Sequence, residues 1–142
     1  MRQFEELVKI GVVKKQSPNR TRALAILKEV REKKDFLELS LKTIPEENMN
    51  SNFIVDYCYD ILMELVRAKM FLDGYNAGNS HEAEVSYMKI LDFEESDIKF
   101  MDELRYYRNG TKYYGTMLGK DYAKKVLEFM NNNYSKLVKF AI

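Results

Sequence analysis

The densest group of polar and aromatic side chains in the chain lies in residues 104–115, LRYYRNGTKYYG, which hold four of the ten tyrosines. Arg105 and Arg108 are three residues apart, so on a helix they share a face. A guanidinium binds phosphate through two parallel hydrogen bonds, and a tyrosine ring offers a plane for base stacking. The spacing predicts a phosphate- and base-binding surface formed by Arg105, Arg108, Lys112 and Tyr114. A helix with a few ion pairs and buried tyrosines is the alternative.

Carboxylates at helical spacing are expected to orient these arginines. Asp102 precedes Arg105 by three residues and is expected to pair with it. Asp60, Glu64 and Arg67 are polar positions of interest on the most apolar helix that the sequence predicts. Glu64 and Arg67 are also three residues apart, which favours an ion pair between them. We expect a polar group of this set to face the arginine-rich segment.

Apolar residues at helical spacing predict the elements that carry these side chains. The predicted helices span residues 3–14, 20–43, 50–75, 79–91, 94–110 and 120–140. Short loops join them, and the chain has no internal repeat and no long linker. The sequence therefore predicts an all-α fold, an up-and-down bundle of five to six helices. Residues 1–142 are expected to form one domain, with residues 1–18 as a possible N-terminal helical extension.

Several single residues have structural explanations. Asn19 or Ser17 is expected to cap the helix over residues 20–43, and Asn50, Ser51 or Asn52 the helix over residues 50–75. Asn79 and Glu82 have the spacing of a capping box, and His81 beside them is expected to cap or pack locally. Cys58 falls on an apolar helix face, which predicts a buried thiol without a catalytic role.

The composition excludes several classes of protein. The chain has 142 residues, of which 46% are hydrophobic and 32% charged, and it has only six Gly and two Pro. This is typical of a globular helical protein rather than a disordered chain or a β-sandwich. One Cys and one His exclude an internal disulfide and a zinc site of cysteines or histidines, and we expect no cofactor. The absence of disulfides favours the cytoplasm, and no apolar run is long enough to cross a membrane.

The net charge of +1 is the sum of three segments whose net charges alternate in sign. Residues 1–45 have eleven basic and six acidic side chains, residues 46–103 have four and fourteen, and residues 104–142 have eight and two. The two basic segments are suited to an anionic polymer, whereas the acidic middle is not. The alternative is that basic and acidic helices neutralise one another within the bundle.

The order and spacing of three short motifs resemble a known family. The motifs are residues 67–74 (RAKMFLDG) at the end of the central helix, Ser80-His81-Glu82, and Leu104-Arg105 with Arg108-Asn109. In this order they resemble the HEPN domain, a small all-helical domain of higher eukaryotes and prokaryotes. The resemblance covers about residues 50–140.

The resemblance implies a site with an altered chemistry. Many HEPN domains are metal-independent ribonucleases, in which two protomers join an Arg–polar–…–His motif for attack of an RNA 2′-OH on the adjacent phosphate. Arg108 matches the arginine and Asn109 the polar position, whereas Tyr113 stands at the usual histidine position. Histidine titrates near pH 6.5 and tyrosine near pH 10, so proton transfer at neutral pH is impaired while phosphate binding is kept. Arg108, Asn109 and Tyr113 are the implied catalytic positions.

Three hypotheses about function follow. The first is a homodimeric HEPN-like domain that binds nucleotide or RNA phosphate through Arg108 and Asn109, with weak or no ribonuclease activity. The second is a metal-independent endoribonuclease toxin of a toxin–antitoxin pair. The third is a non-catalytic interaction module for a nucleotidyltransferase-like partner.

Overall fold

A computed structural model describes residues 1–113, 115 and 117–142, without the side chains of residues 112 and 113. The described part contains six α-helices, one 3-10 helix and two short strands, so the predicted all-α bundle is confirmed. The elements are α1 (Phe4–Lys9), β1 (Lys14–Lys15), α2 (Arg20–Thr43), η1 (Glu46–Asn48), α3 (Ser51–Leu72), β2 (Tyr75–Asn76), α4 (His81–Ile90), α5 (Glu95–Tyr113) and α6 (Lys120–Phe140).

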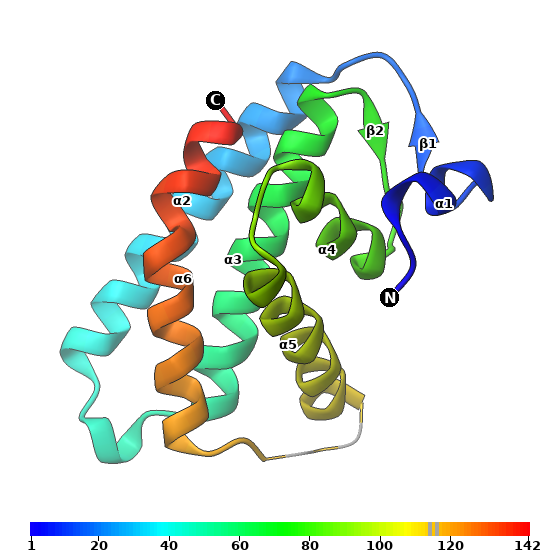
Figure 1. The fold of residues 1–142 in the computed structure, drawn as a ribbon. Coiled ribbons are helices and arrows are strands. Elements are labelled where there is room, and N and C mark those ends of the chain that lie inside the picture. The colour runs from blue at the N-terminus through cyan, green and yellow to red at the C-terminus, as the bar shows by residue number, and fades with distance from the viewer. Residues whose placement is uncertain (114, 116) are drawn as a thin grey trace.

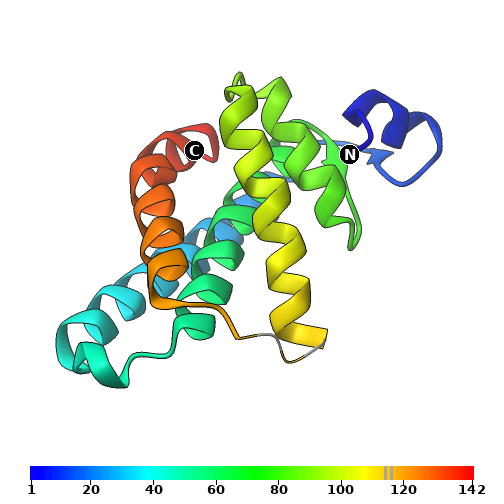
Figure 2. The same ribbon diagram turned by 60° about the horizontal axis from the view of Figure 1, so that its bottom comes forward.

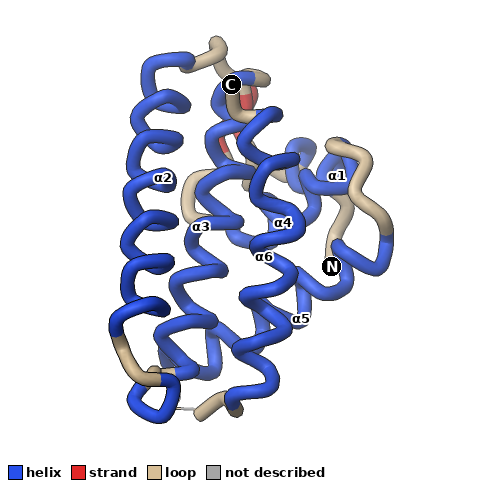
Figure 3. The backbone as a smooth tube through the Cα atoms, turned by 90° about the vertical axis from the view of Figure 1, so that its left-hand side faces the viewer, coloured by secondary structure: helices blue, strands red, loops and turns tan. Residues whose placement is uncertain are grey.

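Helix α3 is the centre of the bundle (Figure 1). Helices α2 and α6 lie along one side of it, and α4 and α5 lie along the other (Figures 1 and 2). Helix α3 runs antiparallel to α2 and α5 and in the same direction as α6 (Figure 1). Helix α2 and the small helix α1 stand at opposite edges of the molecule (Figure 3). A charged residue on α3 can therefore reach partners on several other helices.

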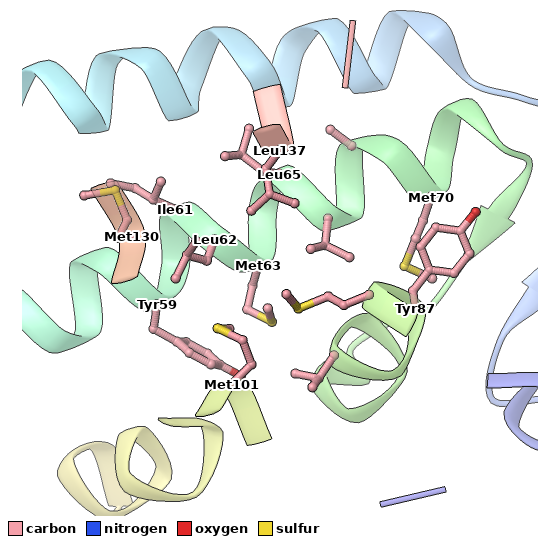
Figure 4. Close-up of a cluster of buried hydrophobic side chains, with 14 of the residues drawn as sticks. Tyr59, Ile61, Leu62, Met63, Leu65, Met70, Tyr87, Met101, Met130 and Leu137 are labelled. Carbon is pink, nitrogen blue, oxygen red and sulfur yellow. The ribbon is translucent and has the colours of Figure 1, made fainter. Parts of the chain in front are cut away.

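The core is built around α3 because this helix is apolar over most of its circumference. Its buried side chains meet residues of α4, α5 and α6, as Figure 4 shows for Met63, Tyr87, Met101 and Met130. The described buried apolar residues form one cluster, and this cluster includes Phe4 and the rest of the buried N-terminal side chains. The N-terminal segment is therefore packed on the bundle and contributes to its core.

The predicted starts of the two longest buried helices are confirmed. The Asn19 side chain accepts a hydrogen bond from the Arg22 N–H at 3.0 Å, and the Asn50 side chain accepts one from the Phe53 N–H at 3.0 Å. These bonds satisfy backbone donors that the first helical turn leaves free. Helix α2 ends at Thr43, just before Ile44 and Pro45, as expected for a residue that precedes proline.

The N-terminal segment differs from the single helix predicted over residues 3–14. Helix α1 ends at Lys9, and β1 follows and pairs antiparallel with β2. Gly74 lies beside this pair of strands and has a φ of +83°. Its carbonyl oxygen accepts a hydrogen bond from the Gln16 N–H at 2.9 Å. A Cβ on Gly74 would lie 2.6 Å from the Gln16 carbonyl oxygen, so glycine is required there.

Two other boundaries also differ from the predictions. The N-cap of α4 is Ser80, whose hydroxyl accepts from the Ala83 N–H at 3.1 Å, so the capping box of Asn79 with Glu82 is wrong. Helix α5 continues through Gly110 to residue 113, although the sequence predicted an end near Gly110. Burial of the preceding turns against α3 outweighs the weak helix propensity of one glycine.

Candidate functional site

Arg108 projects from α5 onto the polar side of α3. Its Nη2 lies 3.2 Å from Asp60 Oδ1, and its guanidinium carbon lies 5.5 Å from the centre of the Tyr59 ring. Only 12% of its side chain is exposed. Its Nε is buried and has no hydrogen-bond partner among the described residues. The expectation that a polar residue of α3 faces Arg108 is confirmed by Asp60.

Asp60 belongs to a row of polar side chains along α3. Its members recur every three or four residues and so share one face of the helix. They are Asp56, Asp60, Glu64 and Arg67, all of them half-buried. Each makes a side-chain contact with another helix, so the row connects α3 to α2, α4 and α5.

The contacts of this row are long-range. Glu64 binds Lys33 of α2 at 2.7 Å, and Asp56 accepts a hydrogen bond from the Thr111 hydroxyl at 2.9 Å. Burial raises the pKa of Glu64 above its ordinary value, although the hydrogen bond from Lys33 lowers it. The predicted pair of Glu64 with Arg67 is wrong, because both side chains find partners on neighbouring helices.

Arg67 joins a buried cluster at the start of α4. Its Nε donates to Glu84 Oε2 at 2.5 Å, and Glu84 Oε1 lies 3.3 Å from His81 Nδ1. The Glu84 side chain is only 2% exposed. The His81 ring lies 5.5 Å from the Tyr59 ring, so His81 packs locally as expected. Burial raises the pKa of Tyr59 far above its ordinary value, and the carboxylate of Glu84 raises it further.

The structure describes only some of the other predicted site residues. The predicted ion pair of Arg105 with Asp102 is confirmed, because Arg105 Nη2 lies 2.8 Å from Asp102 Oδ1. Asn109 is half-buried on α5, next to Arg108. The side chains of Lys112 and Tyr113, and all of Tyr114, lie outside the described residues. The structure therefore brings Arg108 to the polar row of α3 and keeps Arg105 on its local carboxylate.

A surface that the sequence analysis did not find lies next to this row. The rings of Phe36, Phe53 and Tyr57, here called the aromatic face, lie between α2 and α3. Phe53 stacks on Tyr57 at 5.1 Å, and Phe36 lies 6.0 Å from Tyr57 and is 52% exposed. Tyr57 precedes Asp60 by one helical turn, so the aromatic face adjoins the Arg108 contact. The sequence could have indicated this surface through Phe36, a large apolar residue that lies outside the buried stripe of α2.

The comparisons with known proteins found no relative. No protein-family model, no curated protein and no solved structure matches the chain. No helix in the described residues is both long and apolar enough to cross a membrane. The same residues contain no group of three or more His, Cys, Asp or Glu side chains placed to hold a metal ion.

Proposed function

We propose that this chain is a HEPN-like domain that binds the phosphate of a nucleotide or RNA through Arg108 and Asn109, with weak or no ribonuclease activity. The supporting observation is that Asp60 uses only part of the hydrogen-bonding capacity of the Arg108 guanidinium. Asp60 takes one of its hydrogen bonds, and its buried Nε–H has no acceptor among the described residues. A guanidinium has five N–H donors, and the donors that Asp60 does not use are suited to the oxygens of a phosphate.

The charge of Asp60 limits what Arg108 binds alone. The carboxylate fixes the guanidinium but also neutralises it, so a single site would hold phosphate weakly. We propose that a homodimer joins two such sites, with the aromatic face as part of the contact. Three rings on one surface, one of them more than half exposed, are suited to burial against a second copy. This contact would lie beside Arg108, because Tyr57 and Asp60 share a face of α3.

Weak catalysis is proposed on the identity of the residue at the histidine position. Tyr113 stands there in the sequence, and an ordinary tyrosine is protonated at neutral pH. Positioned acid–base catalysis contributes about 10²–10⁴-fold to a rate, so its loss leaves binding with little cleavage. His81 does not supply a replacement in our proposal, because its Nδ1 is turned to the buried Glu84.

The proposal is tested by fluorescence polarisation with a labelled RNA oligonucleotide and with ATP as competitor. We expect Arg108→Ala to weaken RNA binding about tenfold or more, the effect of a lost charge-assisted hydrogen bond. Arg31→Ala removes an exposed arginine of α2 and is the matched control, with affinity close to that of wild type. Equal affinity of wild type and Arg108→Ala would contradict the proposal.

The same samples test the two other hypotheses. Metal-independent RNA cleavage that is lost in Tyr113→Phe would favour the endoribonuclease toxin. The aromatic face favours the third hypothesis, in which a nucleotidyltransferase-like partner covers these rings in place of a second copy. Stoichiometric binding of such a partner, lost in Phe36→Glu, would support this third hypothesis.

A cytoplasmic location is part of the proposal, since the buried Cys58 thiol forms no disulfide.

A further inference from the structure

A second candidate site lies at the end of the bundle where α3 and α6 begin. A cavity of about 300 Å³ opens there between the last turn of α2 and the first turns of α3 and α6. Its floor is apolar and includes Leu41, Ile54, Ala123 and Leu127. None of the described lining residues belongs to α5, so this cavity is distinct from the Arg108 contact.

The opening of the cavity is positively charged on one side. Lys120 and Lys124 lie one helical turn apart on α6, and both line the cavity. Glu46 lies 3.4 Å from Lys124, but both side chains are about 70% exposed, so water screens this pair. Gly119, the N-cap of α6, has no side chain that could accept a hydrogen bond from the first turn of the helix. The positive end of the helix dipole therefore adds to the two lysines.

We propose that this cavity binds a small amphiphile with one anionic head, such as a straight-chain aliphatic carboxylate. The carboxylate would lie at Lys120 and Lys124, at the start of α6, and the alkyl chain would lie on the apolar floor. The volume is at the lower limit for small-molecule sites, which suits a single short chain rather than a two-chain lipid. The cationic side of the opening selects an anion over a neutral or cationic head of the same length.

Titration of the ¹⁵N-labelled protein with octanoate tests this proposal by NMR. We expect shifts of the backbone amide resonances of the residues of α2, α3 and α6 that line the cavity. We also expect octanoate to bind with higher affinity than hexanoate. Each added methylene should tighten binding about two- to fourfold until the cavity is filled. Octanol should bind several-fold more weakly, and octyltrimethylammonium should not shift these amides. Shifts of equal size with octyltrimethylammonium would overturn the charge selection.

Two variants test the assigned positions without changing buried core residues. Lys120→Gln combined with Lys124→Gln should weaken octanoate binding about tenfold, and Lys125→Gln, an exposed neighbour that does not line the cavity, should leave it unchanged. Ile44→Glu places a carboxylate at an exposed lining position and should abolish binding. Octanoate affinity unchanged in both cavity variants would overturn the proposal. RNA binding is measured in parallel, because failure of this site leaves the Arg108 site unaffected.

Discussion

The Arg108 side chain contacts Asp60 and the Tyr59 ring, and Asp60 uses only part of its hydrogen-bonding capacity. A guanidinium has five N–H donors, and the described partner of Arg108 is a single carboxylate oxygen of Asp60. The Tyr59 ring beneath it restricts the side chain further. At the proposed site, Asp60 would have two opposite effects on a phosphate: it orients the guanidinium of Arg108, and its own negative charge repels the phosphate.

These two effects are separated by Asp60→Asn. The amide oxygen still accepts from Arg108, but the competing negative charge is lost, so we expect RNA to bind about three- to tenfold more tightly. Asp35→Asn, which removes an exposed carboxylate of α2, controls for the change in net charge. Fluorescence polarisation at fixed salt measures both variants. RNA binding that is weaker in Asp60→Asn than in wild type would mean that repulsion is the smaller effect.

The helices are joined by ion pairs that connect distant parts of the sequence. Glu84 of α4 binds Arg67 of α3, and Glu82, also of α4, binds Arg2 ahead of α1. The first pair is largely buried and the second is more exposed. Their loss is therefore expected to have different consequences for the docking of α4 on its neighbours.

Removal of Glu84 should destabilise the bundle strongly. Glu84→Ala leaves Arg67 half-buried without its carboxylate and creates a gap beneath His81. We expect a loss of about 2–4 kcal/mol in the free energy of unfolding, measured by urea denaturation. Glu95→Ala, at an exposed position of α5, should change it by less than about 0.5 kcal/mol. A loss in Glu84→Ala no larger than that of the control would show that the buried pair is not stabilising.

The contact of Glu82 with Arg2 predicts a pH dependence. Hydrogen bonds from the Arg2 side chain and backbone lower the pKa of Glu82 to about 2. Because the pKa is lowered on folding, the stabilisation is complete above the ordinary value near 4.5 and is lost as the pH falls from there to about 2. The difference in melting temperature between wild type and Glu82→Gln should therefore vanish at about pH 2. A difference that grows towards low pH would contradict this assignment.

Over the whole molecule, the alternating charge of the sequence is partly cancelled between segments. Lys33 with Glu64 and Arg108 with Asp60 each join a basic segment to the acidic middle. This supports the interpretation that basic and acidic helices neutralise one another within the bundle. In the proposed function, affinity for RNA comes from a few positioned donors such as Arg108, which a homodimer would present twice.

The proposed dimer is tested by light scattering after size exclusion. We expect wild type to have the mass of a dimer, and Phe36→Glu to shift it to the monomer because it places a charge on the aromatic face. Leu24→Glu changes an exposed apolar residue nearer the start of the same helix and should leave the mass unchanged. A wild-type protein that is monomeric at every concentration would exclude a dimer through this face.

Features fixed by local sequence were predictable. Helical periodicity located α2, α3 and α6, the candidate caps at two helix starts included Asn19 and Asn50, and Asp102 lies three residues before its partner Arg105. All of these depend on residues within about one helical turn.

Features that depend on tertiary contact were not predictable. The pair of β1 with β2 joins segments about sixty residues apart, and the partners of Glu64 and Arg67 lie on other helices. Spacing alone favoured the local pair of these two residues. The Asp60 contact of Arg108 was anticipated only as one of several polar positions on α3, because no periodicity specifies which of them meets α5.

The proposed phosphate contact of the Arg108 guanidinium is measured at the residue itself by NMR of the arginine Nε–H groups. Arg108→Lys identifies the resonance of Arg108 in the ¹⁵N-labelled protein. We predict that this resonance shifts progressively on titration with an RNA oligonucleotide, while that of the exposed Arg31 stays in place. An Arg108 resonance that is unmoved when RNA binding is saturated would contradict the account.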